Sequence, residues 1–154
     1  MRLETSDRVK VAESRIGLGV FASRRLRRGQ MVGEIRGEIT HGVDNATPYC
    51  IELDETRSLE PHAPFRFLNH CCEPNCEIYS WDEDGDRDMV YLQTLRTIQP
   101  GEELTIDYAW PADAAIRCKC DALKCRGWVV DINELDQLLA TKKPKQRKKM
   151  AAAK

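Results

Sequence analysis

The sequence lacks a long apolar run, because no apolar stretch approaches the roughly 18 residues that a membrane-spanning helix needs. Its opening residues, MRLETSDRVK, are charged and lack the apolar centre of a secretory signal. It has no internal repeat, and 154 residues suit one domain with a real core. We therefore expect a soluble intracellular protein with no membrane partner.

The sequence also lacks a C-x-x-C motif, which argues against a redox pair. Structural disulfides are uncommon inside cells. The seven cysteines therefore need another explanation, and metal binding is the usual one.

Acidic residues are absent from the last 13 residues, KKPKQRKKMAAAK, which hold six lysines and one arginine. Removing these seven from the 24 basic residues leaves 17 against 25 acidic ones, so the remaining body carries about −8. An acidic body suits a basic peptide partner better than nucleic acid. Residues 144–154 are predicted to be a disordered basic tail, which either contacts nucleic acid or only aids solubility.

Short stretches with strand character fill the body, separated by glycine and proline every eight to twelve residues. They read VKVAES (9–14), GVFAS (19–23), MVGEIRGEIT (31–40), YCIELDE (49–55), CEIYSW (76–81), MVYLQTL (89–95) and ELTIDYAW (103–110). CEIYSW and MVYLQTL flank DEDGDRD and predict a hairpin around Gly85. This pattern predicts a mostly β fold.

One helix is predicted over residues 131–143. Asp131 precedes Glu134 by three residues, which is capping-box spacing. Its apolar face is predicted to hold Ile132, Leu135, Leu138 and Leu139, and Pro144 ends the helix.

Three cysteines near the C-terminus, Cys118, Cys120 and Cys125, form C-x-C-x4-C in CKCDALKCRGW. Three thiolates are one ligand short of a tetrahedral zinc site. The segment RFLNHCCEPNC (66–76) offers candidates for the fourth. The alternatives for these cysteines are small buried side chains, a Cys-His nucleophile and a vicinal Cys71–Cys72 disulfide.

Four segments, in order, resemble the SET domain of protein-lysine methyltransferases. These are GLGVFASRRLRRGQMVGEIRGEI, RFLNHCCEPN, GEELTIDY and the post-SET zinc segment CKCDALKCRGW. The resemblance implies a SET fold of short curved sheets with a pseudoknot-like crossing, plus a C-terminal helix. It places the SET domain at 8–110 and the post-SET zinc segment at 114–130. No cysteine precedes Cys50, so a pre-SET cluster is missing.

The resemblance also implies roles for individual residues. It predicts binding of S-adenosylmethionine by Gly17, Leu18, Gly19, Asn69, His70, Tyr108 and Trp128, with Trp128 on the adenine and His70 contacting through its backbone. Tyr108 would lie beside the transferred methyl group, and Tyr49 would line the lysine channel. Cys72 would be the fourth zinc ligand, completing Cys118, Cys120 and Cys125.

Two departures from the family pattern bear on the product and the substrate. Ile106 stands where relatives usually carry Phe or Tyr, at a position that helps set the number of methyl groups. The insert after YCIELD is short, which leaves room for a partner or a second subunit to complete the groove. A homo-oligomer is therefore one expectation.

The resemblance predicts an S-adenosylmethionine-dependent protein-lysine N-methyltransferase that acts on basic flexible segments, histone-like or other. The alternative is a catalytically silent SET-like binding module whose basic tail contacts nucleic acid. Location follows the source, cytoplasmic in a prokaryote and nuclear or chromatin-associated in a eukaryote.

Overall fold

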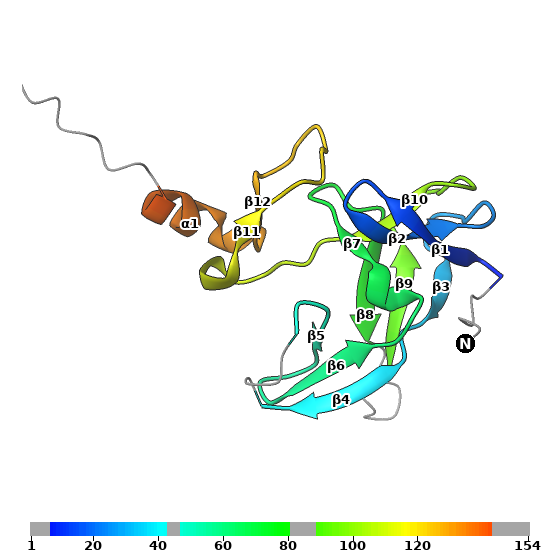
Figure 1. The fold of residues 1–154 in the computed structure, drawn as a ribbon, viewed down its shortest axis with the longest axis horizontal. Helices are drawn as coiled ribbons and strands as arrows, with labels where there is room; N and C mark the ends of the chain where they lie inside the picture. The colour runs from blue at the N-terminus through cyan, green and yellow to red at the C-terminus, as the bar shows by residue number, and fades with distance from the viewer. Residues whose placement is uncertain (1–6, 43–46, 81–88, 143–154) are drawn as a thin grey trace, which may run out of the picture.

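The fold was analysed in a computed structural model that describes residues 7–42, 47–80 and 89–142. The predicted tail, Gly85 and the turn around it lie outside these residues. The described chain is built mainly from short strands in several small sheets, with one α-helix near the C-terminal end (Figure 1). This arrangement confirms the predicted mostly β fold.

The elements follow one another closely along the chain. The strands are β1 (Val9–Ser14), β2 (Gly17–Ala22), β3 (Met31–Glu34), β4 (Gly37–His41), β5 (Ile51–Glu52), β6 (Arg57–Pro61), β7 (Asn69–His70), β8 (Cys76–Ser80), β9 (Val90–Thr94), β10 (Glu103–Ile106), β11 (Ile116–Arg117) and β12 (Trp128–Val129). The helical elements are the 3-10 turns η2 (Phe65–Phe67), η3 (Ala112–Ala114) and η4 (Ile132–Glu134), and helix α1 (Leu135–Lys142).

Four sheets form from these strands, with the orders β1-β2-β10-β7, β3-β9-β8, β4-β6-β5 and β11-β12. Every pairing is antiparallel except that of β10 with β7. β8 and β9 pair as the predicted hairpin, with Ser80 opposite Val90. The parallel pair therefore joins segments that are more than 30 residues apart in sequence.

The single strand predicted over residues 31–40 is wrong, because the chain changes sheets in the middle of it. β3 pairs with β9, whereas β4 pairs with β6. Ile35, between them, is buried and donates its N–H to Val90 O at 2.7 Å. At Gly37 a Cβ atom would lie 2.0 Å from Glu60 O, so only glycine allows β4 to approach β6 here.

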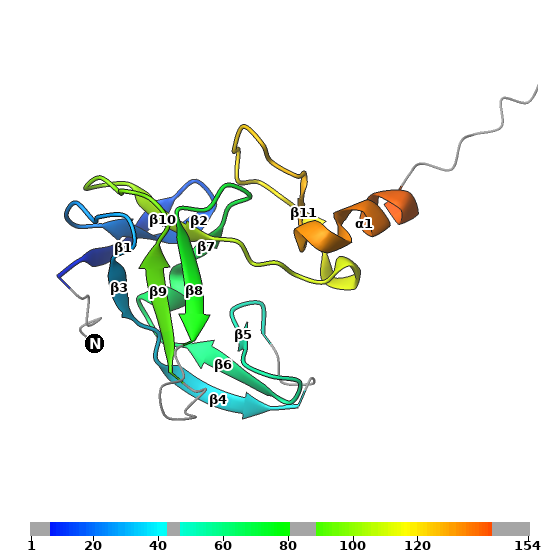
Figure 2. The same cartoon turned by 180° about the vertical axis from the view of Figure 1, so that it is seen from behind.

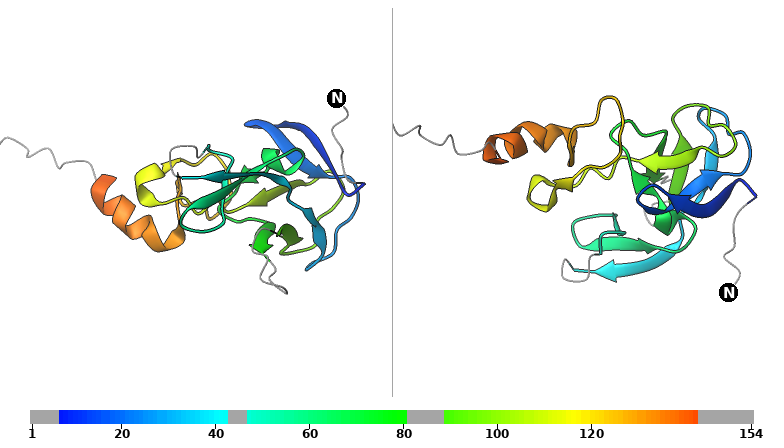
Figure 3. Two further views of the ribbon diagram at one scale, coloured as in Figure 1. Left: turned by 90° about the horizontal axis from the view of Figure 1, so that it is seen from below. Right: turned by 45° about the horizontal axis from the view of Figure 1, so that its top comes forward.

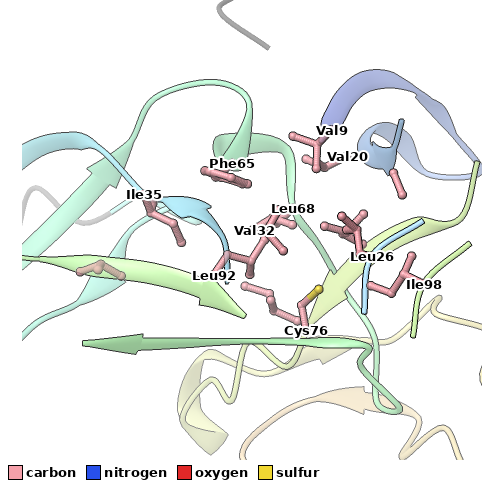
Figure 4. Close-up of a cluster of buried hydrophobic side chains, with 14 of the residues drawn as sticks. Val9, Val20, Leu26, Val32, Ile35, Phe65, Leu68, Cys76, Leu92 and Ile98 are labelled. Carbon is pink, nitrogen blue, oxygen red and sulfur yellow. The ribbon is translucent and has the colours of Figure 1, made fainter. Parts of the chain in front are cut away.

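The hydrophobic core lies between the sheets and draws on nearly every strand of the body (Figure 4). Val20, Leu26, Leu92, Ile98 and Leu104 have no exposed surface. Two of these residues lie near the N-terminus, before residue 30, and three lie after residue 90. Leu68 of RFLNHCCEPN and Leu104 of GEELTIDY belong to this core, so its packing fixes the positions of both motif segments.

The predicted C-terminal helix is present, but it is shorter and less buried than expected. Asp131 caps it as predicted, since its Oδ1 accepts a hydrogen bond from Asn133 N at 2.8 Å. A complete capping box would also have the Glu134 side chain accept from Asp131 N. Glu134 Oε2 instead accepts a hydrogen bond from Ala112 N at 2.6 Å, so that part of the prediction is wrong. Of the expected apolar face, Leu138 is buried, whereas Ile132 and Leu139 are exposed.

The C-terminal part extends away from the sheets as an arm that carries β11, β12 and α1 (Figures 1 and 2). Two further views show the same projection of α1 from the body (Figure 3). Within the described residues, α1 packs against η3 and η4, which leaves Leu139 exposed while Leu138 is buried. In the part of the chain that is described, no helix is long and apolar enough to cross a membrane.

Candidate active site and cysteine cluster

Two of the motif segments, RFLNHCCEPN and GEELTIDY, meet through the parallel pairing of β7 with β10. Asn69 lies opposite Thr105, and His70 lies opposite Ile106. The pairing continues past β7, where Cys71 N donates to Ile106 O at 3.0 Å. Two motif segments whose paired residues are 36 positions apart therefore lie side by side and form one wall of the candidate site.

Asn69 connects this wall to the first residues of β2. Its Nδ2 donates to Leu18 O at 3.0 Å and to Glu103 Oε1 at 2.8 Å. A Cβ atom at Gly19 would lie 2.4 Å from the same Glu103 oxygen, so a larger residue there would displace the Glu103 carboxylate that Asn69 contacts. Among the described residues no donor is bonded to Asn69 Oδ1, which leaves that oxygen available to a ligand.

His70 links the cysteine-rich segment to Tyr108 through its ring. Tyr108 N donates to Nδ1 at 3.0 Å, so Nδ1 carries no proton, and Nε2 lies 3.4 Å from Cys72 Sγ. We assign the ring proton to Nε2, which then donates to the sulfur. Burial lowers the pKa of His70; the Asp107 carboxylate opposes this and Arg126 adds to it. The prediction for His70 named only its backbone and missed this ring contact.

Tyr108 lies where the motif strands meet a cavity. Its hydroxyl donates to Leu68 O, and its ring lies 5.4 Å from the rings of both His70 and Trp110. Burial, with smaller contributions from Tyr49 and Glu103, raises the pKa of Tyr108 to about 12. The phenol is therefore neutral at physiological pH and acts as a hydrogen-bonding group rather than a base.

The cavity has a volume of about 720 Å³ and contains both predicted tyrosines in its lining. Its other walls come from residues 47–52, from Phe65 to Leu68 and from Ile106 to Ala114. Tyr49 is 46% exposed at this cavity, and the Arg66 guanidinium lies 4.2 Å above its ring. Apolar side chains such as Leu68 and Ile106 and the carboxylates Glu52 and Asp107 both line it. It suits a chain with an apolar stem and a cationic end.

The four cysteines predicted as zinc ligands converge. The sulfur atoms of Cys72, Cys118, Cys120 and Cys125 all lie within 4.8 Å of one another. Cys72 Sγ is 3.7 Å from Cys118 Sγ and 3.9 Å from Cys125 Sγ. A tetrahedron with Zn–S bonds of about 2.3 Å has S–S edges of about 3.8 Å. These distances fit four ligands of one metal ion. They are too long for a disulfide, whose S–S bond is about 2.05 Å.

Backbone N–H groups point at each of these sulfurs, as expected for thiolates. Cys118 Sγ accepts from Cys120 N, and Cys125 Sγ accepts from Gly127 N. Arg126 N donates to Cys72 Sγ, and Cys72 N donates to Cys120 Sγ. The donor set fits a structural Zn²⁺, and a metal held there would connect Cys72 of the body to the three cysteines of the arm.

Two arginines reinforce this attachment. Arg126 Nη2 donates to Asp107 Oδ1 at 2.8 Å, with its side chain only 9% exposed. This hydrogen bond is the main reason that the pKa of Arg126 is raised. Arg15, in the β1–β2 turn, donates to Lys119 O at 2.7 Å. These two contacts thus hold the cysteine cluster against Asp107, next to Tyr108, and against the turn between β1 and β2.

Replacing Arg126 with methionine is expected to lower the free energy of unfolding by about 2 kcal/mol. The value is less than for a fully buried pair because Asp107 remains 30% exposed. Arg36→Met is the matched control, since its ion pair with Glu34 is mostly solvated and should contribute less than about 1 kcal/mol. Denaturant unfolding of both variants measures the difference, and equal losses would contradict it.

Trp128, in β12, has two cationic neighbours at its ring. The Arg117 guanidinium lies 4.2 Å from the centre of its ring, and Lys142 Nζ lies 5.5 Å away. Its ring contacts, as far as the chain is described, do not include Asn69, His70 or Tyr108. Its predicted role on the adenine therefore stays a prediction.

Sequence reasoning missed Asn75, Arg126 and Trp110. Asn75 is buried, donates to Glu103 O and accepts from Thr105 N, both at 2.8 Å. It lies inside the RFLNHCCEPN motif, so a polar residue next to Pro74 was the available signal. Arg126 and Trp110 carry no periodic or spacing signal.

A family model described as SET domain matches residues 17–109, so the chain belongs to the SET domain family. The cysteines at 118–125 lie beyond this match. In the match with the crystal structure of KRYPTONITE in complex with mCHH DNA, H3(1-15) peptide and SAH, the TM-score is 0.68 at 25% identity. That match covers 79% of this chain and 29% of the other.

Curated relatives are also similar in sequence. The chain is 32% identical over 132 residues to histone-lysine N-methyltransferase ASHH1 of Arabidopsis thaliana, covering 73% of this chain and 26% of that protein. It is 32% identical over 150 residues to the H3 lysine-36 specific histone-lysine N-methyltransferase of Homo sapiens, covering 85% and 5%. The chain thus spans at most about a quarter of the length of these relatives.

Proposed function

We propose that the chain is an S-adenosylmethionine-dependent protein-lysine N-methyltransferase that acts on lysines in basic, flexible segments. The observation that carries this proposal is the position of Tyr108. Its backbone N–H donates to the ring of His70, in the wall formed by β7 and β10. Tyr108 also lines the cavity, as Tyr49 does. A group bound against the wall and a side chain in the cavity would meet at this tyrosine.

Cofactor binding is supported by the joined motifs. Asn69 would hold the cofactor through its free Oδ1, beside the turn of Gly17, Leu18 and Gly19. S-adenosylmethionine, when bound, supplies an electrophilic methyl group on a sulfonium. Zn²⁺, held by Cys72, Cys118, Cys120 and Cys125, would be structural, since all four of its positions are filled by protein.

The cavity residues prepare the lysine side chain for attack. Its amine must be neutral to attack, yet its ordinary pKa is about 10.4. Apolar lining by Leu68, Ile78 and Ile106 disfavours the ammonium form. Tyr108, fixed by Leu68 O, orients the amine, and the aromatic rings accommodate cationic methylated forms. Alignment of this kind supplies most of the rate enhancement.

A basic protein substrate is supported by charge and by the relatives. Glu52 and Asp107 line the cavity, where Asp107 is paired with Arg126 and the lining residue Arg66 is paired with Glu60, and the body as a whole is acidic. The relatives are named histone-lysine methyltransferases, and the similar crystal structure contains an H3 peptide. We therefore propose histone-like proteins as the first substrates to examine, and a nuclear location if the source is eukaryotic.

The decisive experiment is transfer of an isotopically labelled methyl group from S-adenosylmethionine to a panel of basic proteins. Mass spectrometry of the products identifies the modified lysines, with the slower variant Tyr108→Phe as the control. Zinc-loaded protein that binds the cofactor but methylates none of the panel would support the silent binding module instead.

Ile106→Tyr is expected to reduce the number of methyl groups added to each lysine. Ile106 is buried at the cavity wall, so a larger phenol there would narrow the space around the amine. We expect the monomethylated product to accumulate, as read by mass spectrometry of a peptide substrate. Ile78→Tyr, at another position of the lining, is the control. An unchanged product distribution in Ile106→Tyr would contradict the role of this position.

A further inference from the structure

The loop between β2 and β3 concentrates positive charge. Residues 23–30 read SRRLRRGQ and contain four arginines and no acidic residue. Arg24, Arg25, Arg27 and Arg28 are all exposed. Arg24 forms an ion pair with Asp7 at 3.2 Å, but no described acidic side chain pairs with Arg25, Arg27 or Arg28. We call residues 23–30 the arginine loop.

The arginine loop has a fixed backbone. Leu26, in the middle of the arginines, is fully buried and exchanges two 2.9 Å hydrogen bonds with Ile98. Gly29 N donates to Thr94 O at 3.0 Å, and Gln93 Nε2 donates to Gly29 O at 2.9 Å. An anchored loop holds its arginine backbones in place before a partner arrives, which reduces the entropy lost on binding.

The surroundings add further positive charge. Ser23 N donates to Arg8 O, and Lys10 lies opposite Phe21 in the β1–β2 register, so the backbones of Arg8 and Lys10 lie beside the segment that leads into the arginine loop. The Arg8 guanidinium itself donates to Met31 O and Val32 O. The next loop, between β9 and β10, contributes Arg96, which is paired with Glu102. This basic end contrasts with the acidic balance of the body as a whole.

The arginine loop also lies far from the proposed active site. The segments between β2 and β3 and between β9 and β10 lie at the end of the molecule opposite α1 in both views (Figures 1 and 2). None of residues 23–30 lines the cavity that contains Tyr49 and Tyr108. Methyl transfer therefore gives these arginines no role.

We infer that the arginine loop is a docking surface for the phosphate backbone of a nucleic-acid duplex. Arginine presents a planar fork of donors that matches phosphate oxygens, and its charge persists at every physiological pH. A single strand is a poorer fit, because residues 23–30 and 95–101 contain no aromatic side chain on which a base could stack. Recognition is of the backbone and is independent of sequence.

Binding of a labelled 20-base-pair DNA duplex by the full-length chain tests this inference, measured by fluorescence anisotropy across a range of salt concentrations. Two variants have the same change in net charge. R25Q/R27Q/R28Q removes the unpaired arginines, whereas the control R36Q/K119Q/K124Q removes exposed charges elsewhere. Each lost phosphate contact reduces the magnitude of the slope of log K against log salt by about 0.9. If each of the three arginines contacts one phosphate, the slope for the loop variant should be smaller in magnitude by about 2.7.

We expect the loop variant to bind the duplex at least tenfold more weakly than the control at 0.1 M salt. R25K/R27K/R28K keeps the three charges, so it should retain the salt dependence while losing part of the affinity with the guanidinium forks, which separates lost charge from lost folding. Equal losses in loop and control variants would overturn the inference and assign binding to overall charge or the tail. Stronger binding of a single-stranded oligonucleotide or of an anionic vesicle than of the duplex would also overturn it. Methyl transfer to a free peptide should not change in the loop variant, so failure here is distinguishable from failure of the proposed activity.

Discussion

Tyr108→Phe is expected to lower the rate of methyl transfer about 100-fold while leaving cofactor affinity nearly unchanged. The phenyl ring can still pack against His70 and Trp110, whose rings lie 5.4 Å away. The lost hydroxyl is the group that Leu68 O fixes at the edge of the cavity. Without it the amine loses its orientation, and small misplacements of reacting groups cost about 100-fold in rate.

Tyr79→Phe is the matched control, because it removes a hydroxyl from the β8–β9 hairpin and leaves the cavity lining intact. Single-turnover methyl transfer gives the rate, and calorimetric titration with S-adenosylmethionine gives the affinity. Asn69→Ala should show the opposite pattern, with affinity lost first, because Asn69 supports the glycine turn. Wild-type turnover in Tyr108→Phe would contradict the role assigned to this tyrosine.

Cys72→Ser is expected to abolish tight zinc binding and to release the C-terminal arm. Cys72 is the ligand from the body, whereas Cys118, Cys120 and Cys125 all belong to the arm. Structural zinc sites contribute on the order of 10 kcal/mol of binding free energy. The same sulfur lies 3.4 Å from His70 Nε2, so its loss also removes a partner of the ring that holds Tyr108 N. Activity should therefore fall together with zinc content.

Cys71→Ser is the matched control, since it changes the adjacent thiol, which is not among the four clustered sulfurs. Elemental analysis should find one zinc per chain in this control and less than one in Cys72→Ser. Limited trypsin digestion should cut Cys72→Ser rapidly after Lys119 and Lys124, which lie between the cysteines of the arm. Wild-type zinc content and protease resistance in Cys72→Ser would show that Cys72 is not a ligand.

Local patterns in the sequence were enough to predict several elements. Alternating apolar residues predicted β1, and two such stretches around a polar turn predicted the β8–β9 hairpin. Asp131 signalled the start of the C-terminal helical segment. These features depend on contacts between neighbours in the chain, so their signals lie within a few residues.

The site was predictable in part for a different reason. C-x-C-x4-C spacing predicted a metal site, and the family motifs supplied Cys72 from a distance of more than 40 residues. The motifs also assigned Asn69 and Tyr108 to one predicted cofactor site. In the structure Asn69 lies in β7, and Tyr108, just after β10, donates its N–H to His70 of β7. Composition and spacing alone would not have joined these segments.

The sequence by itself therefore determined the β-rich class and, through the C-x-C-x4-C spacing, three candidate metal ligands, whereas Cys72 and the residues proposed for methyl transfer were predicted from the family motifs. Only the tertiary structure decided where the run 31–40 breaks, that the His70 ring bridges Cys72 to Tyr108, and that Glu134 bonds to Ala112 instead of completing its capping box. It also decided that Arg126 pairs with Asp107. Each of these contacts joins segments brought together by packing of the core, and side chains of similar local preference compete for such partners. Their outcome depends on distances in the folded chain, which no local pattern in the sequence records.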